Sequence, residues 1–140
     1  MVNILTGQKG SGKTQKMMEL ANEKAKAYKG NVVFIKNSHH DTRNVDFNIR
    51  VVCMDDYPAI KNSDSYIGFL YGMYSANLDT ECVFIDGLLK YADINFEDVP
   101  NFITRLKQLS AECGVDYYVS ISADKADLAG EAFEGCTFVN

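Results

Sequence analysis

The amino-acid sequence predicts an α/β fold, a three-layer sandwich in which helices cover both faces of a mostly parallel sheet of five or six strands. Two observations carry this prediction. Short apolar runs typical of buried strands alternate with longer stretches of helical periodicity, as parallel sheets require. With 140 residues, 46% of them apolar, the chain is long enough for one hydrophobic core. We therefore expect a single domain over residues 1–140.

A glycine-rich segment joins the first predicted strand to the first predicted helix. The apolar run 2–5 predicts the strand, and apolar side chains at helical spacing predict a helix from Lys13 to Tyr28 that Gly30 ends. At their junction, residues 7–14 fit the pattern G-x-x-x-x-G-K-[ST]. Main-chain N–H groups can wrap a polyphosphate only where side chains do not block the approach, and glycines meet this condition. The segment therefore predicts a phosphate-binding loop.

The residue types in this loop predict that it binds a nucleoside triphosphate together with its metal ion. Lys13 is expected to neutralise phosphate oxygens, and Thr14 offers a hydroxyl ligand to Mg²⁺. The N-terminus of the following helix adds its partial positive charge. The expected cofactors are thus ATP and Mg²⁺, bound by a nucleotide-binding domain. The predicted loop consists of Gly7, Gln8, Lys9, Gly10, Ser11, Gly12, Lys13 and Thr14.

Two further strands are predicted in the middle of the chain. Residues 32–35 form a continuous apolar run that predicts a buried strand, and residues 49–53 suggest a third, short strand. The polar stretch 37–44 lies between them. In open α/β sheets, ligand-facing loops leave the sheet at the carboxyl ends of strands, so this stretch is expected at the ligand edge.

A helix is expected over residues 64–78, capped by Ser63 or Asp64. Its small residues recur at every fourth position, and we expect this stripe to lie close against the sheet, where packing offsets the low helix propensity of glycine. Its tyrosines predict core packing, with a stacking surface for bases or a partner interface as alternatives. The stripe is Gly68, Gly72 and Ala76, and the tyrosines are Tyr66, Tyr71 and Tyr74.

Residues 82–86 are four apolar residues followed by a carboxylate. This pattern predicts a buried strand beside the first strand, with Asp86 directed at the Mg²⁺ shell. The alternative is an Asp that begins a turn at Gly87. The remaining expected elements are a helix over 99–113 ended by Gly114, a strand over 117–122 with Ser122 at the ligand edge, a short helix near 124–133 and a strand over 136–139.

This order of elements resembles the RecA-like group of P-loop NTPases, and within it RecA, KaiC and the DnaB-type helicases. The resemblance rests on the loop 7–14, on residues 84–88 and on the segment 103–114 followed by a strand with polar residues at its end. It implies that another strand lies between the loop strand and the strand that ends at Asp86. It also implies Mg²⁺ held by Thr14 and, through water, by Asp86, with Lys13 and Asp86 in the catalytic site.

The chain departs from that group at the residue that activates water. Members of the group place a glutamate at the end of the second strand or beside the metal aspartate, where this chain has Lys36-Asn37 and Gly87. Asp41 or His39 could substitute if the loop that carries them folds over the site, and the alternative is that both are solvated loop residues. Slow hydrolysis, or binding without turnover, therefore competes with an active ATPase.

The resemblance further implies a neighbouring subunit or protein partner that supplies an arginine, with Arg43 and Arg105 as candidates in this chain.

A second resemblance is to thymidine kinases, which have a similar loop and an Asp-x-Arg segment after the second strand, as Asp41-Thr42-Arg43 is here. Their zinc ribbon and their glutamate beside the metal aspartate are missing. Three functions stay open: an ATPase switch or assembly factor, a small-molecule kinase, and a nucleotide-binding regulatory subunit without turnover.

Charge and composition limit the partners. Residues 1–50 carry nine Lys/Arg against four Asp/Glu, whereas residues 51–140 carry five against fifteen, and the net charge is -5. Nucleic-acid binding by this chain alone is not expected, because it needs many cationic contacts. No run is apolar enough for a membrane span and no signal peptide is recognisable, so we expect a cytoplasmic protein.

The four cysteines are scattered and predict buried, reduced thiols. A zinc site is not expected, because His39-His40 has no cysteine near it in the sequence.

Overall fold

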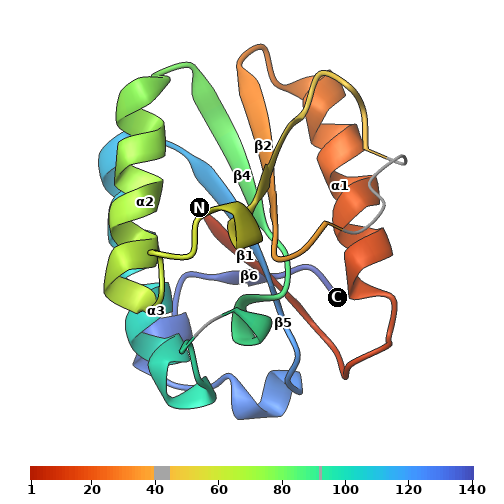
Figure 1. Cartoon of the computed structure of the whole chain (residues 1–140). Helices are drawn as coiled ribbons and strands as arrows, with labels where there is room; N and C mark the ends of the chain where they lie inside the picture. The colour runs from red at the N-terminus through yellow and green to blue at the C-terminus, as the bar shows by residue number, and fades with distance from the viewer. Residues whose placement is uncertain (40–44, 92) are drawn as a thin grey trace.

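The computed structural model describes residues 1–39, 45–91 and 93–140. Within them, the strands are β1 Val2–Thr6, β2 Asn31–Lys36, β3 Arg50–Cys53, β4 Thr80–Ile85, β5 Asp116–Ile121 and β6 Thr137–Phe138. They form one sheet in the order β3-β2-β4-β5-β1-β6, and each strand pairs in parallel with its neighbours (Figure 1). The predicted parallel sheet is confirmed, at the upper end of the expected number of strands.

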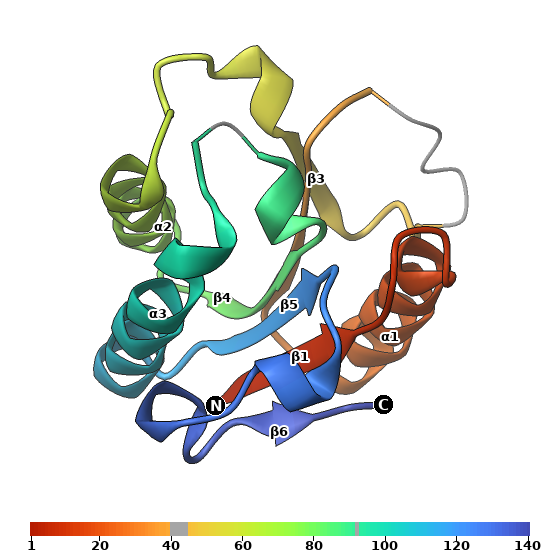
Figure 2. The same ribbon diagram turned by 90° about the horizontal axis from the view of Figure 1, so that it is seen from below.

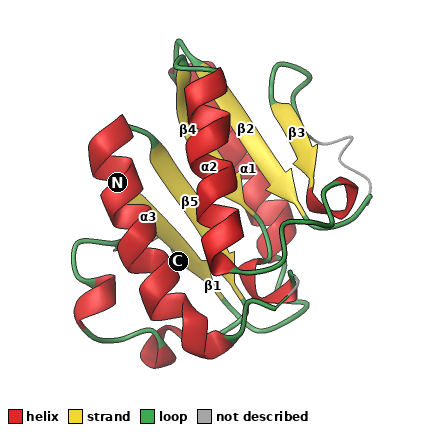
Figure 3. Cartoon of the chain, turned by 60° about the vertical axis from the view of Figure 1, so that its left-hand side comes forward, coloured by secondary structure: helices red, strands yellow, loops and turns green. Residues whose placement is uncertain are grey.

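Helices cover both faces of the sheet, which gives the three predicted layers. The helix α1, Lys13–Ala27, packs on one face (Figure 2). The helices α2, Ser63–Ala76, and α3, Val99–Cys113, lie side by side on the other (Figure 3). None of the described helices has both the length and the apolar character needed to cross a membrane. The short 3-10 helices are η1 Met54–Asp56, η2 Leu88–Lys90, η3 Phe96–Asp98, η4 Lys125–Asp127 and η5 Glu131–Phe133.

The central strands are mostly apolar because both faces of the sheet are largely buried there. In β2, Val33 and Ile35 belong to the core beneath α2 and α3, whereas Val32 and Phe34 belong to the core beneath α1. This is the alternation of a strand with a period of two residues. In the core beneath α1, the rings of Phe84 and Tyr118 stack with centroids 4.5 Å apart.

The order of the strands decides between two expectations. β5 lies between β1 and β4, so the strand that precedes Asp86 is not beside the strand that precedes the glycine-rich loop. The expectation of direct neighbours was wrong, and the inserted strand implied by the RecA-like resemblance is confirmed. Parallel pairing still brings the carboxyl ends of β1, β4 and β5 to one edge of the sheet.

The helix α2 differs from its prediction in two ways. Its N-cap is Asn62, whose side chain accepts from the N–H of Ser65, instead of Ser63 or Asp64. The stripe of Gly68, Gly72 and Ala76 is exposed and does not pack on the sheet. The buried face is formed by Tyr66, Ile67 and Leu70. Large side chains bury more apolar area than glycine, and they determine which face is turned inward.

The prediction of core packing is confirmed for Tyr66. This residue is 1% exposed, and its ring contacts the rings of Tyr91 and Phe102 edge to face. Tyr71 is partly exposed, and its hydroxyl donates to Glu112 of α3 at 2.8 Å. Neither ring lies at the loop of residues 7–14, and Tyr74 is half-buried against the core.

The remaining boundaries lie within two residues of the predictions, apart from the short helix expected near 124–133. α1 ends at Ala27, before Gly30, and Gly30 serves a close contact: a Cβ there would lie 2.2 Å from the carbonyl oxygen of Asp79. The helix expected near 124–133 is two separate 3-10 turns, η4 and η5. Cys53 and Cys82 are buried as expected, whereas Cys113 and Cys136 are only half-buried, and all four thiols are free. α3 ends at Gly114 as predicted.

Candidate functional site

The glycine-rich loop turns from β1 into α1 at the carboxyl edge of the sheet. Gly12 is the N-cap of α1 and has φ 88°, a conformation that costs other residues free energy. Gly7 has φ 147°, and a Cβ on it would lie 2.5 Å from the hydroxyl oxygen of Ser11. The loop backbone is therefore accessible because these two positions lack side chains.

Lys13 lies within this loop and is nearly buried, with 8% exposed. Its Nζ donates to the carbonyl oxygens of Gly7, at 3.0 Å, and Gln8, at 2.8 Å. Burial lowers the pKa of Lys13, and the positive charge of Lys90 lowers it further, whereas the nearby Asp86 opposes the shift. An anion bound in the loop would be stabilised by this ammonium group and would favour its protonated form.

Thr14 and Asp86 meet across the same edge although 72 positions separate them in the sequence. The Thr14 hydroxyl donates to Asp86 Oδ2 at 2.8 Å. Ser120, fully buried at the end of β5, donates to Asp86 Oδ1 at 2.8 Å and accepts from the N–H of Gly87 at 2.7 Å. The Asp86 carboxylate is thus fixed from both sides, by the loop and by β5.

These groups line a pocket of about 330 Å³. Its walls are Gly10, Gly12, Lys13, Thr14, Asp86, Gly87, Lys90, Ser120 and Ser122. Of the residues predicted to hold phosphate and metal, the pocket wall includes Gly10, Gly12, Lys13, Thr14 and Asp86 but not Gly7, Gln8, Lys9 or Ser11. Ser122, which was expected at this edge, also lines the pocket. The hydroxyl of Ser122 is buried and has no hydrogen-bond partner among the described residues.

Two pocket residues, Lys90 and Ser120, were missed by sequence reasoning. Ser120 had a usable signal, because it is a hydroxyl inside an otherwise apolar strand and such a group needs a partner when buried. Lys90 had no such signal, because the sequence around it does not distinguish a lysine that lines a pocket from a lysine that is exposed to solvent. The 3-10 turn η2 directs it back to the pocket.

Other predicted residues lie elsewhere. His39 is not in the pocket: its Nε2 lies 2.7 Å from Asp56 Oδ1, and both side chains are exposed. The expectation that His39 could reach the site is therefore not met. Arg105 forms an ion pair with Asp64 of α2 and does not line the pocket. Asp41 and Arg43 lie outside the described residues.

Asn37 follows β2, the position where related proteins carry a glutamate. Its side-chain amide donates to the carbonyl of Gly87 at 2.9 Å, and its own carbonyl accepts from the N–H of Asp55 at 3.0 Å. The residue therefore links the loop after Asp86 to the end of β3. It offers an amide, which cannot accept a proton from water as a carboxylate can.

Comparison with known proteins identifies the family. The sequence model of the RNA helicase family matches residues 3–81, more than half of the 140 residues. The chain belongs to the RNA helicase family. The match includes the glycine-rich loop, and it ends within β4, before that strand reaches Asp86.

The fold is also that of a KaiC-like protein from the hyperthermophilic archaeon Pyrococcus horikoshii OT3. The two share 19% sequence identity with a TM-score of 0.63, over 87% of this chain and 61% of the archaeal one. At this identity the likeness shows the fold. Among curated proteins, none is significantly similar to this chain in sequence. Family and fold together make it a nucleotide-binding P-loop NTPase of the RecA/KaiC group.

P-loop NTPases of this kind generally bind their nucleotide with Mg²⁺, and the residues in the pocket fit that ion. Mg²⁺ prefers hard oxygen ligands and uses one or two protein groups beside the phosphates. Thr14 Oγ1 and Asp86 Oδ2, 2.8 Å apart, are a hydroxyl and a carboxylate oxygen on the pocket wall.

Proposed function

We propose that the chain binds Mg·ATP, with its phosphates on the loop from Gly7 to Thr14. The observation that carries this proposal is the convergence of Lys13, Thr14 and Asp86 on one pocket. The loop N–H groups and the N-terminus of α1 would hold phosphate oxygens, and Lys13 would neutralise their charge. The carbonyls of Gly7 and Gln8 keep the Lys13 ammonium inside the loop.

Thr14 and Asp86 would hold the metal. When bound, Mg²⁺ neutralises phosphate charge that develops during phosphoryl transfer. The chain itself contributes the orientation of the ligands: Ser120 fixes one carboxylate oxygen of Asp86, which leaves the other directed at Thr14. The role of Asp86 as a metal ligand is favoured over that of a simple turn residue because its oxygen faces the pocket.

Lys90 would add a second positive charge to the phosphate site. It lines the pocket, and its positive charge adds to burial in lowering the pKa of Lys13. Two ammonium groups close together repel each other, and a polyphosphate between them removes that repulsion. Lys90 is thus a candidate within the pocket itself for stabilising phosphate charge.

Hydrolysis by the chain alone would be slow. Among the described residues that line the pocket, Asp86 is the carboxylate, and none is a glutamate or a histidine. Asp86 is already engaged by Thr14 and Ser120, so it is poorly placed to accept a proton from water. We infer that turnover depends on a partner or a second copy that supplies an arginine, or on Asp41, as expected from the sequence.

RNA-stimulated ATP hydrolysis is the second candidate, favoured by the family to which the chain belongs. The charge distribution argues against it for this chain alone, since residues 51–140 carry fifteen acidic against five basic residues. RNA affinity depends on cationic contacts with phosphates. A small-molecule kinase and a regulatory subunit without turnover also stay open, because the loop and the metal site would serve them equally.

One assay separates these functions. Purified protein is incubated with Mg·ATP alone, with single-stranded RNA, and with nucleosides as acceptors, while ADP and free phosphate are measured. We expect slow phosphate release that RNA does not change. Stimulation by RNA would favour the helicase function, ADP formation that requires an acceptor would favour a kinase, and tight binding without ADP would favour a regulatory subunit. No ATP binding at all would contradict the proposal.

A further inference from the structure

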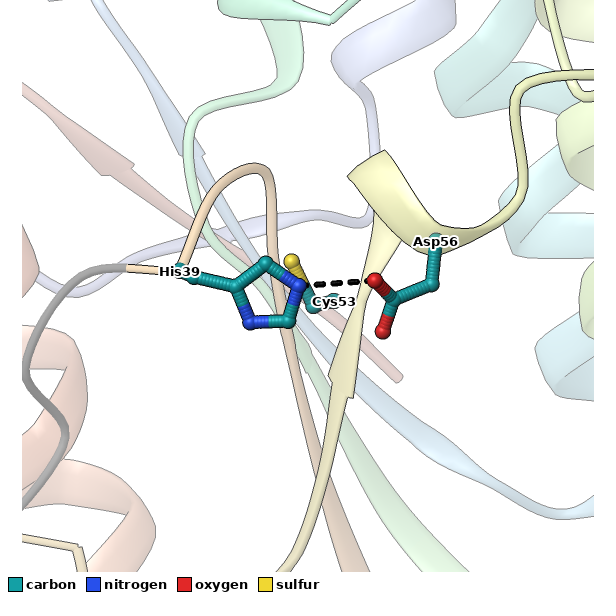
Figure 4. A group of neighbouring side chains, drawn as sticks. All are labelled: His39, Cys53 and Asp56. Carbon is teal, nitrogen blue, oxygen red and sulfur yellow. Dashed lines mark hydrogen bonds and ion pairs between the residues drawn. The ribbon is translucent and has the colours of Figure 1, made fainter.

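A group of metal-binding side chains lies at the end of the sheet formed by β2 and β3. His39 follows β2, Cys53 ends β3, and Asp56 belongs to η1. One potential ligand atom from each lies within 4.8 Å of the other two (Figure 4). Figure 4 shows the imidazole of His39 and the carboxylate of Asp56 directed at each other, with the thiol of Cys53 beside them.

We propose that His39, Cys53 and Asp56 together bind one Zn²⁺ ion. A thiolate, an imidazole and a carboxylate are the ligand types that zinc takes in proteins, at about 2.0–2.3 Å. In a tetrahedral site, those lengths put two ligand atoms roughly 3.3–3.6 Å apart. The present separations, 2.7 Å between His39 Nε2 and Asp56 Oδ1 and at most 4.8 Å for any pair, need shifts on the order of 1 Å.

The three residues combine one fixed ligand with two that can adjust. Cys53 is buried and held by the pairing of β3 with β2. His39 and Asp56 are exposed, with side-chain accessibilities of 66% and 51%, so small rotations can bring both onto an ion. Three protein ligands leave the fourth position of a tetrahedral ion to water.

The charges of the three ligands suit a divalent ion. Binding would release the thiol proton of Cys53 to solvent, and neutral His39 would coordinate through Nε2. The thiolate and the carboxylate of Asp56 then balance the two positive charges of zinc. Magnesium is a poorer fit, because it prefers oxygen ligands and does not favour sulfur.

Strand pairing explains why the sequence did not predict this group. Lys36 of β2 lies in register with Cys53 of β3, so the residues just after β2 meet the end of β3. A zinc site was not expected because His39 has no cysteine among its neighbours in the sequence. The parallel pair of strands supplies the missing thiol, and η1 supplies the carboxylate.

A bound ion would fasten the ends of β2 and β3 close to the nucleotide pocket. The carbonyl of Asn37 accepts from the N–H of Asp55 at 3.0 Å and weakly from Cys53 Sγ at 3.6 Å. The amide of Asn37 donates to Gly87, the residue after Asp86. The zinc site would thus be a structural clamp connected to the proposed magnesium ligand Asp86 through Asn37 and Gly87.

The alternative is a surface ion pair between His39 and Asp56 above an ordinary buried thiol. Such an exposed pair contributes little to stability and does not depend on metal. The two interpretations differ in one measurable property, the presence of a thiolate bond to a bound ion.

Cobalt tests this directly, because Co²⁺ occupies zinc sites and its bond to a thiolate gives a near-ultraviolet charge-transfer absorption. Reduced, metal-free protein with any purification tag removed is titrated with Co²⁺ and then with Zn²⁺. We expect the absorption to saturate at one Co²⁺ per chain and to disappear when Zn²⁺ displaces it. No such absorption in the unaltered protein would overturn the proposal.

Matched variants identify the ligands. Cys53→Ser should abolish the absorption, whereas Cys113→Ser should retain it. Asp56→Asn should weaken Zn²⁺ binding by more than the roughly 10- to 100-fold caused by losing an outer-shell partner, whereas Asp55→Asn should leave it unchanged. An absorption that survives Cys53→Ser, or equal Zn²⁺ affinity in the two aspartate variants, would overturn the assignment.

Asp56 is exposed, so its variant tests the site even if Cys53→Ser does not fold. The titration contains no nucleotide, and its outcome is therefore independent of whether the chain binds ATP.

Discussion

The hydroxyl of Thr14 donates to the carboxylate of Asp86 at 2.8 Å, and this contact joins the first helix to the end of the fourth strand. In the proposed function, both oxygens turn to the same magnesium ion. Thr14 lies within residues 3–81, the region that the family model matches, and its hydrogen-bond partner Asp86 lies outside that region.

Replacing Asp86 with Asn should reduce the dependence of ATP binding on Mg²⁺. An amide is a weaker ligand for a hard cation than a carboxylate, and it brings no negative charge to the metal. ATP affinity is measured by calorimetry with Mg²⁺ and with chelator, using Asp79→Asn as a control because Asp79 is exposed, precedes β4 and lies outside the pocket wall. If the Mg²⁺ dependence is the same in all three proteins, Asp86 is a turn residue and not a metal ligand.

Lys90→Gln should lower ATP affinity near neutral pH and move its alkaline decline to higher pH. Burial and the charge of Lys90 lower the pKa of Lys13, so Lys13 loses its proton, and with it the attraction for phosphate, at a lower pH than an ordinary lysine. Removing Lys90 removes one cause of that shift. The test is ATP affinity from neutral to alkaline pH, with exposed Lys61→Gln for comparison. A decline at unchanged pH in the Lys90 variant would show that the two lysines do not interact.

Ser120→Ala should destabilise the fold by about 1–3 kcal/mol. The substitution leaves the buried N–H of Gly87 without its acceptor and removes one donor from Asp86. Denaturant unfolding gives the free energy, and Ser75→Ala on the exposed side of α2 is the matched control. Equal losses in both variants would mean that Ser120 has no special structural role.

Gly68→Ala should stabilise the protein by about 1 kcal/mol, because alanine has a higher helix propensity and a Cβ at this position meets no atom within 4 Å. Gly30→Ala should destabilise it, since its Cβ would collide with the carbonyl of Asp79. Thermal unfolding compares the two. A loss of stability in the Gly68 variant would restore the idea that this stripe packs against the sheet.

The sequence predicted the sheet and the glycine-rich turn from β1 into α1 well because both have local signals. Continuous apolar runs identify strands buried on both faces, and the pattern of residues 7–14 carries its own chemistry. The prediction of the inward face of α2 was wrong. It rested on the helical spacing of small residues, whereas Tyr66, Ile67 and Leu70 bury a larger apolar area. Local pattern alone does not weigh those areas.

Contacts between distant segments were the least predictable part. Lys90 reaches the pocket through the turn of η2, and the group of His39, Cys53 and Asp56 exists because β2 and β3 pair in register. Neither arrangement has a signature in spacing along the chain. The absence of a glutamate after β2 was visible in the sequence, whereas the use of Asn37 as a link to Gly87 required the structure.

The most direct test of the central claim is the affinity of Lys13→Ala for Mg·ATP, measured by calorimetry beside its stability to denaturant. A charge-assisted hydrogen bond is worth about 1.5–3 kcal/mol, so affinity should fall by roughly 10- to 100-fold. The free energy of unfolding should change little, because the hydrogen bonds of the Lys13 ammonium to described residues are to the loop carbonyls of Gly7 and Gln8, and its burial lowers its pKa. Unaltered ATP affinity in this variant would contradict phosphate binding by the loop.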